Sequence, residues 1–219
     1  MVRPTTPLIS RDSCTRAALA IIDEEGLEAL SLDKLARVLG VKAPSLYHHF
    51  RDKAEILASV ARLVVLETPV LPEPTVQNWQ EWLVEMCVGF RDSILKHPRA
   101  APLLLSHYPR QFMLSGYERT SRVLARVGVP LELHVLIIEG ADTLTLGSAL
   151  YSASRVTSGQ PEFPVVDPDR DPMLARALDA NRCTREEAFA ETVRSFLRGA
   201  LTATPRATRR RNRVKSAAG

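Results

Sequence analysis

The segment from Ala43 to His49 holds the side chains of this sequence that are best suited to contact a polar partner. Leu46 and Phe50 lie four residues apart, so a short helix here directs both toward the core. The opposite face and its flanks then carry side chains that are small or able to form hydrogen bonds: Pro44, Ser45, Tyr47, His48 and His49. Because a solvated helix face normally carries long charged side chains, this composition predicts contact with a flat polar surface.

The major groove of a DNA duplex is such a surface. Serine and histidine can bond to base edges there, Ala43 can touch a thymine methyl group, and Tyr47 can reach a phosphate. Asp52 can cap the next helix, so that the first N–H groups of that helix and Lys53 face a phosphate. The alternative is that the two histidines are ordinary surface residues, and the Tyr-His-His run alone leaves both interpretations equally open.

Two helices and a tight turn should position this segment. The first helix is predicted from Ser10, a good N-cap, to Gly26, which ends it. The second begins after Ser31, whose hydroxyl can cap it, and ends at Gly40. Pro44 suits the first turn of a brief third helix, and a fourth, connecting helix opens a few residues later. This order of elements predicts a three-helix, helix-turn-helix domain.

A proline-rich stretch follows the connecting helix. Pro69, Pro72 and Pro74 fall within it and predict a boundary between two domains. We therefore expect one domain over residues 1–68 and a larger helical domain over residues 75–203. In the larger domain, helical patterns run over residues 79–97, 111–127, 131–153 and 185–201, with a loop over 154–172 and a short helix over 173–181.

Composition favours an all-α protein. The 219 residues are 45% apolar with a mean hydropathy of −0.06, and they are poor in glycine and aromatic residues. The last residues, Arg206 to Lys215, hold six of the 29 basic residues and no acidic one, which leaves 23 basic against 25 acidic residues elsewhere. The net charge of +4 is therefore no argument for nucleic acid, and residues 204–219 should form a disordered basic tail.

The sequence gives no sign of a membrane segment or of catalytic machinery. The N-terminus lacks the apolar stretch of a signal peptide, and the most apolar helical pattern carries Glu139 and Asp142 in mid-span. The three cysteines are far apart and form no CxxC pair, which fits a reducing cytoplasm. P-loop, GxGxxG, GxSxG and HExxH motifs are missing, so we expect no enzyme. A helical enzyme or a protein-binding adaptor without a role on DNA remains the alternative.

The segment around the predicted turn closely resembles the helix-turn-helix of the tetracycline repressor (TetR) family. The matching features are LxxLARxLGV from Leu32, Ala-Pro-Ser-Leu-Tyr-x-His-Phe from Ala43, and the Asp-Lys pair that opens the connecting helix. The resemblance implies an all-α regulator that binds double-stranded DNA, with contact residues Ser31, Ala43, Pro44, Ser45, Tyr47, His48, His49 and Lys53. Asp33 stands where the tetracycline repressors carry a base-reading arginine, which implies a different operator.

The larger domain resembles the ligand domain of the tetracycline repressors more weakly, in Asn78–Leu83, Gly89–Arg91 and Leu144–Gly147. Of the drug-binding positions only Phe90 matches, and the groups that hold a magnesium chelate are missing. We therefore expect an unidentified small apolar or aromatic effector, with no metal and no cofactor. The candidate ligand-binding residues are Met86, Phe90, Leu104, His107, Tyr108, Asp142 and Tyr151. Plain core packing is the alternative for the apolar ones, and a place at a dimer seam is the alternative for Asp142.

The resemblance also implies a homodimer built on the helices over residues 131–153 and 185–201. Candidate interface residues are Gly140, Gly147, Phe189, Val193 and Phe196, and packing within one chain is the alternative. A two-fold axis suits DNA reading, because a single short helix reads too few base pairs to be selective. The sequence therefore predicts a cytoplasmic, ligand-responsive repressor that binds a palindromic operator as a dimer and is released by its effector.

Overall fold

The computed structural model describes residues 9–161 and 163–202, and this part of the chain folds into helices and loops without a β-strand. The expected all-α fold is therefore confirmed. The elements are α1 (Arg11–Glu25), η1 (Leu27–Ala29), α2 (Leu32–Val38), η2 (Ala43–His48), α3 (Lys53–Leu66), α4 (Trp79–Leu95), α5 (Leu103–Ser106), α6 (Arg110–Arg126), α7 (Leu131–Ser158), α8 (Pro172–Ala180) and α9 (Arg185–Thr202). The predicted basic tail lies outside the described residues.

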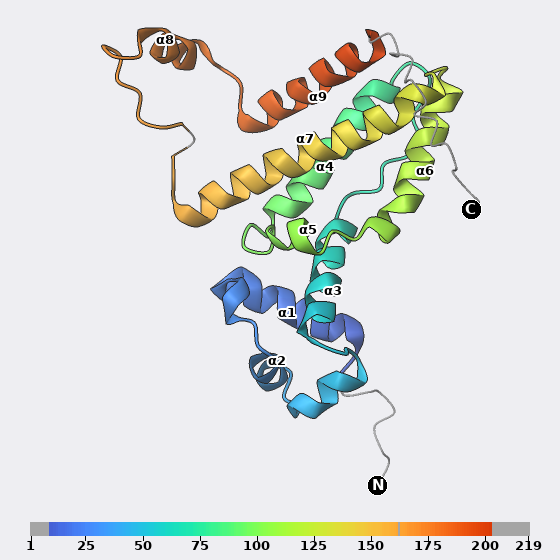
Figure 1. Ribbon diagram of the computed structural model, residues 1–219, viewed down its shortest axis with the longest axis vertical. Helices are drawn as coiled ribbons and strands as arrows, with labels where there is room; N and C mark the ends of the chain where they lie inside the picture. The colour runs from blue at the N-terminus through green and yellow to red at the C-terminus, as the bar shows by residue number, and fades with distance from the viewer. Residues whose placement is uncertain (1–8, 162, 203–219) are drawn as a thin grey trace, which may run out of the picture.

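The small N-terminal domain lies at one end of the molecule and is joined to the larger domain through α3 (Figure 1). Its helices begin at side-chain caps, since Ser10, Ser31 and Asp52 each accept a hydrogen bond from the backbone N–H three residues later. The turn before η2 contains Gly40 at φ +67°, a conformation that glycine adopts without strain.

The third helix is a 3₁₀ helix, where the sequence predicted only a brief helix. The N–H of Ser45 donates to the carbonyl of Lys42 at 2.9 Å, and the N–H of His49 donates to that of Leu46 at 2.9 Å. Both bonds span three residues, which is the tighter pattern that short segments adopt. This helix is too short to be stable by itself, and the burial of Leu46 and Phe50, which are 1% and 2% exposed, holds it against the core.

The larger domain packs around α4, α7 and α9, with α6 lying along α7. The structure differs from the predicted loop over 154–172, because α7 continues to Ser158 and ends at Gly159, whose φ is +64°. Beyond it, the loop and α8 project away from the other helices (Figure 1), and α8 has no buried residue.

Helix α7 is the one described helix that is long and apolar enough to cross a membrane by length and composition. In this chain α7 packs against α4, α6 and α9. A core helix of a helical domain passes the same test, so this finding gives weak support to a membrane segment.

Candidate functional site

The helix-turn-helix exposes the side chains that the sequence predicted to contact DNA. Pro44, Tyr47 and His48 are exposed on η2, and Ala43, Ser45 and His49 are half-buried. Ser31, at the start of α2, and Lys53, the first residue of α3, are exposed as well. These residues therefore lie at the surface of one helix-turn-helix unit, while Leu46 and Phe50 hold η2 to its core.

Arg11 of α1 fixes the position of η2 relative to α3. Its guanidinium donates to the carbonyl of His49 at 2.9 Å and to the carboxylate of Glu55 at 2.6 Å, and it lies 4.6 Å from the ring centre of Phe50. The backbone N–H of Arg51 and the Arg11 guanidinium together lower the pKa of Glu55 to about 2. These contacts of Arg11 could not be predicted from the sequence, because the partners are about 40 residues apart.

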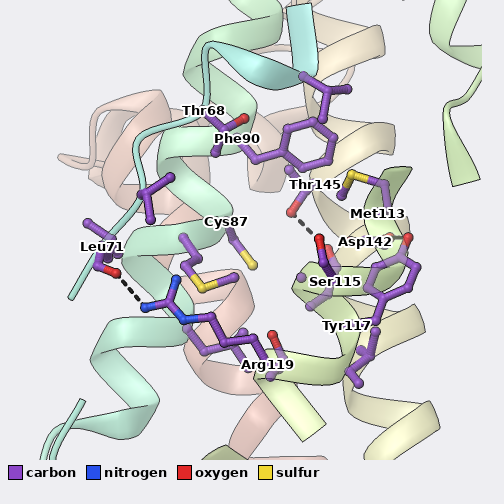
Figure 2. A pocket seen from close by; sticks show the side chains of 18 of the residues that line it. Thr68, Leu71, Cys87, Phe90, Met113, Ser115, Tyr117, Arg119, Asp142 and Thr145 are labelled. Atoms are coloured by element: carbon purple, nitrogen blue, oxygen red, sulfur yellow. Dashed lines mark hydrogen bonds between the residues drawn. The ribbon is translucent and has the colours of Figure 1, made fainter. Parts of the chain in front are cut away.

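A cavity of about 240 Å³ that opens to the surface lies between the end of α3, the segment after it, α4, α6 and α7 (Figure 2). A cavity of about 150 Å³ can hold benzene, so this one admits a larger ring system. Its lining is mostly apolar and includes Leu66, Thr68, Pro69, Leu71, Leu83, Met86, Cys87, Phe90, Phe112, Met113, Tyr117, Arg119, Thr120, Ile138, Asp142 and Thr145. The structure thus brings the predicted residues Met86, Phe90 and Asp142 together at one cavity.

Asp142 is the one carboxylate in this lining. Its Oδ2 accepts hydrogen bonds from the phenols of Tyr117 and Tyr108, the latter at 3.1 Å. Burial raises the pKa of Asp142, and the two phenols oppose that rise. Burial also raises the pKa of Tyr117 to about 12, so both phenols keep their protons and remain donors at neutral pH. Tyr108 therefore supports the cavity through Asp142 without lining it.

Three of the predicted ligand residues lie elsewhere. Leu104 is buried in a core that it shares with residues of the N-terminal domain. His107 forms a hydrogen bond with the hydroxyl of Ser106 at 2.8 Å. Tyr151 is 66% exposed and lies against Arg155 on the far side of α7 from the cavity lining. The structure does not bring these three residues to the cavity. The weak resemblance that suggested them does not determine which helix face or loop each residue occupies.

The sequence reasoning missed the α6 wall of the cavity. Met113, Tyr117 and Thr120 are spaced by four and three residues, so helical periodicity could have grouped them on one face. The wall formed by Leu66, Thr68 and Pro69 had no local signal, since only the docking of α3 on the larger domain creates it.

The predicted dimer residues fall into two groups. Val193 and Phe189 are 0% and 6% exposed, so within this chain they belong to the core between α4, α7 and α9. Gly140 lies against the ring of Phe196, where a Cβ would come within 2.1 Å of the ring, so this pair also packs within the chain. Gly147 is exposed, and a Cβ built on it would meet no atom within 4 Å.

His97 ties the two domains together. Its Nδ1 lies 2.6 Å from a carboxylate oxygen of Asp23 in α1, and its Nε2 lies 3.1 Å from one of Glu67 at the end of α3. Arg99 adds a hydrogen bond to the carbonyl of Asp23 at 3.0 Å. The end of α3, α1 and the segment after α4 therefore meet at one set of polar contacts.

The reactivity of Cys87 tests whether the part of the cavity wall on α4 is buried. Burial raises the pKa of Cys87 to about 11, and Cys183 is exposed. Since the thiolate is the reactive form, a maleimide at pH 8 should label Cys183 first and Cys87 far more slowly. In a variant with Cys14→Ser and Cys183→Ser, where Cys87 is the remaining thiol, labelling by iodoacetamide followed by intact mass should speed up as the pH rises above 8. Equal rates for Cys87 and Cys183 at pH 8 would contradict a buried wall.

A helix-turn-helix head joined to a helical domain with a mostly apolar cavity defines a ligand-responsive transcription regulator. Residues 15–60 match the family described as bacterial regulatory proteins, tetR family, and residues 71–204 match the tetracyclin repressor-like C-terminal domain. The chain belongs to the TetR family, and the resemblance seen in its sequence is confirmed.

Relatives and solved structures agree with this assignment. Tetracycline repressor protein class E of Escherichia coli is 29% identical over 194 residues, which is 87% of this chain and 90% of that protein. Structures of ActR from Streptomyces coelicolor, free and in complex with actinorhodin, are 28% identical with a TM-score of 0.71, and cover 90% of this chain and 97% and 98% of theirs. The relatives are regulators, so an enzyme is not favoured.

Proposed function

We propose that this chain is a cytoplasmic homodimeric repressor, released from a palindromic operator when a small apolar or aromatic effector fills the cavity of the larger domain. The observation that carries the proposal is that Leu66, Thr68 and Pro69, at the end of the connecting helix and just beyond it, form one wall of that cavity. The helix that leads from the DNA-binding head therefore contacts the effector directly.

On DNA, we assign base reading to the exposed face of η2. Ser45 and His48 can bond to base edges, with Ala43 and Pro44 in close contact beside them. Tyr47, Ser31 and Lys53 are placed for the phosphates, and His49 flanks the same face. The two heads of a dimer would read two half-sites, which supplies the selectivity that one short helix lacks.

Effector binding acts through the end of α3. Occupation of the cavity favours the position of α3 that makes room for the effector, and the contacts of His97 with Asp23 and Glu67 pass the shift to α1. A shift of this kind biases the two heads away from the operator spacing. The preference of the effector for the released state sets the size of the response.

For the dimer, we propose the outward faces of α7 and α9. Five small exposed side chains on α9 recur at spacings of four and three residues: Ala188, Thr192, Ser195, Gly199 and Thr202. On α7 the outward face carries Leu136, Thr143, Gly147 and Tyr151 at similar spacings, with Leu136 and Tyr151 48% and 66% exposed. The distance between two packed helices depends on the side chains at their contact, so small residues at this spacing permit close helix pairing. Of the residues predicted from the sequence, Gly147 fits this interface best, since Phe189 and Val193 are already buried within the chain.

Ligand release is the test of the proposal. A panel of neutral and charged fused-ring aromatic compounds should contain some that raise the melting temperature of the protein and release it from DNA of its own promoter. Stabilisation should persist in excess EDTA, because the proposed site needs no metal. It should also follow the concentration of the compound, as expected for a ligand that binds only the folded state.

The same panel defines the outcomes that count against the proposal. Loss of stabilisation in EDTA would overturn the metal-free site. Compounds that stabilise the protein while leaving DNA binding unchanged would overturn the coupling through α3. A mobility-shift experiment that finds no preference for the promoter DNA would favour the protein-binding adaptor.

A further inference from the structure

The carboxylate of Asp142 is held by hydrogen bonds from two phenols and lies beyond ion-pair distance of Arg110, the basic residue whose charge acts on it. The two phenols that donate to its Oδ2 are neutral, and the positive charge of Arg110 acts on Asp142 from a longer distance. In the described part of the chain, Oδ1 accepts no hydrogen bond, yet it is not one of the fully enclosed atoms without a partner. One oxygen of this carboxylate is therefore accessible and unpaired.

The basic residue of the cavity lining is turned away from Asp142. The guanidinium of Arg119 donates to the carbonyl of Leu71 and lies 5.3 Å from the ring centre of Trp82. Figure 2 shows Arg119 extended toward Leu71, on the other side of the cavity from Asp142 and Tyr117. The cavity thus has the carboxyl group of Asp142 on one wall and, on another, a guanidinium that already binds the carbonyl of Leu71.

The rest of the wall suits an apolar cation. Phe90 and Tyr117 supply aromatic rings, and Met86 and Met113 supply polarisable thioethers. Burial raises the pKa of Asp142 by more than the two phenols and the charge of Arg110 lower it, which means that burial disfavours the ionised form. A positive charge placed at Oδ1 would remove that destabilisation.

We infer that the effector carries a protonated amine that binds Asp142, joined to an apolar or aromatic body that fills the remainder of the cavity. The inference rests on the proposed function and specifies its effector class. The amine donates to Oδ1 while Tyr108 and Tyr117 continue to hold Oδ2. Asp142 is thereby the residue that determines specificity between amines and neutral molecules of the same shape.

A matched pair of probes tests this inference: 2-(1-naphthyl)ethylamine and its neutral analogue 2-(1-naphthyl)ethanol. Titration calorimetry on the wild-type protein at neutral pH should show the amine binding about tenfold to a hundredfold more tightly, the range of one charge-assisted hydrogen bond. In an Asp142→Asn variant the amine should lose its advantage over the alcohol. Unchanged helix content by circular dichroism shows that the variant folds.

Glu139→Gln is the control, because this exposed acid precedes Asp142 by three residues on the same helix. The variant should keep the preference for the amine. Loss of the preference in this variant would show that it arises from the overall negative charge of α7 rather than from Asp142. Equal binding of both probes to the wild type, with release of operator DNA by both, would overturn the amine inference and leave the proposed function standing. Binding of neither probe would overturn the inference, and a failure of the whole panel would overturn the ligand pocket as well.

Discussion

Replacing Ser45 and His48 together by alanine should abolish the preference of this regulator for its operator over random DNA. Both side chains lie on the outward side of η2, so their removal leaves the anchors Leu46 and Phe50 in place and the domain folded. The expected loss is on the order of 1–3 kcal/mol for each base pair that is no longer read. Fluorescence anisotropy on operator and random duplexes at several salt concentrations measures it.

Lys53→Ala is the matched control, since it removes one phosphate contact and no base contact. It should weaken binding to both duplexes by similar factors and lower the salt slope by about one unit. Deleting the residues after Pro205, which lie outside the described part of the chain, should likewise leave the operator-to-random ratio nearly unchanged. A collapse of that ratio on tail deletion, with the double variant still selective, would show that the helix-turn-helix is not the reader.

Gly147→Arg should convert the proposed dimer into a monomer. Within one chain the substitution is accommodated, because a Cβ at this position meets no atom within 4 Å. Loss of a glycine from the middle of α7 even favours the helix by about 1 kcal/mol. In a dimer that brings the outward faces of α7 together, the same arginine would place a bulky charge in the seam, which costs several kcal/mol when it is unpaired.

Sedimentation equilibrium at micromolar concentration should therefore give a dimer for the wild type and a monomer for the variant, with unchanged helix content by circular dichroism. Loss of the dimer should also lower the affinity for the operator, because one head reads only one half-site. Ala125→Arg, an exposed position on α6, is the control and should remain dimeric. A monomeric wild type, or a dimeric Gly147→Arg variant, would contradict the proposed interface.

The DNA-binding head could be predicted from the sequence because its signals are local. The caps at Ser10, Ser31 and Asp52 act over three residues, and the anchoring of η2 depends on Leu46 and Phe50 four residues apart. Such short-range rules hold in any context that keeps the chain folded. Even here the 3₁₀ form of η2 was not predicted, because it depends on where the neighbouring elements hold the two ends.

In the larger domain the sequence determined which segments are helices, and the tertiary structure decided what each face contacts. An apolar helical face indicates burial but not its partner, so Phe189 and Val193 could equally have faced a second copy or their own core. The cavity needs the end of α3, a face of α6 and Asp142 of α7 to meet across about 75 positions of sequence. Only the packing of α3, α4, α6 and α7 brings them together, and it leaves one oxygen of Asp142 without a partner.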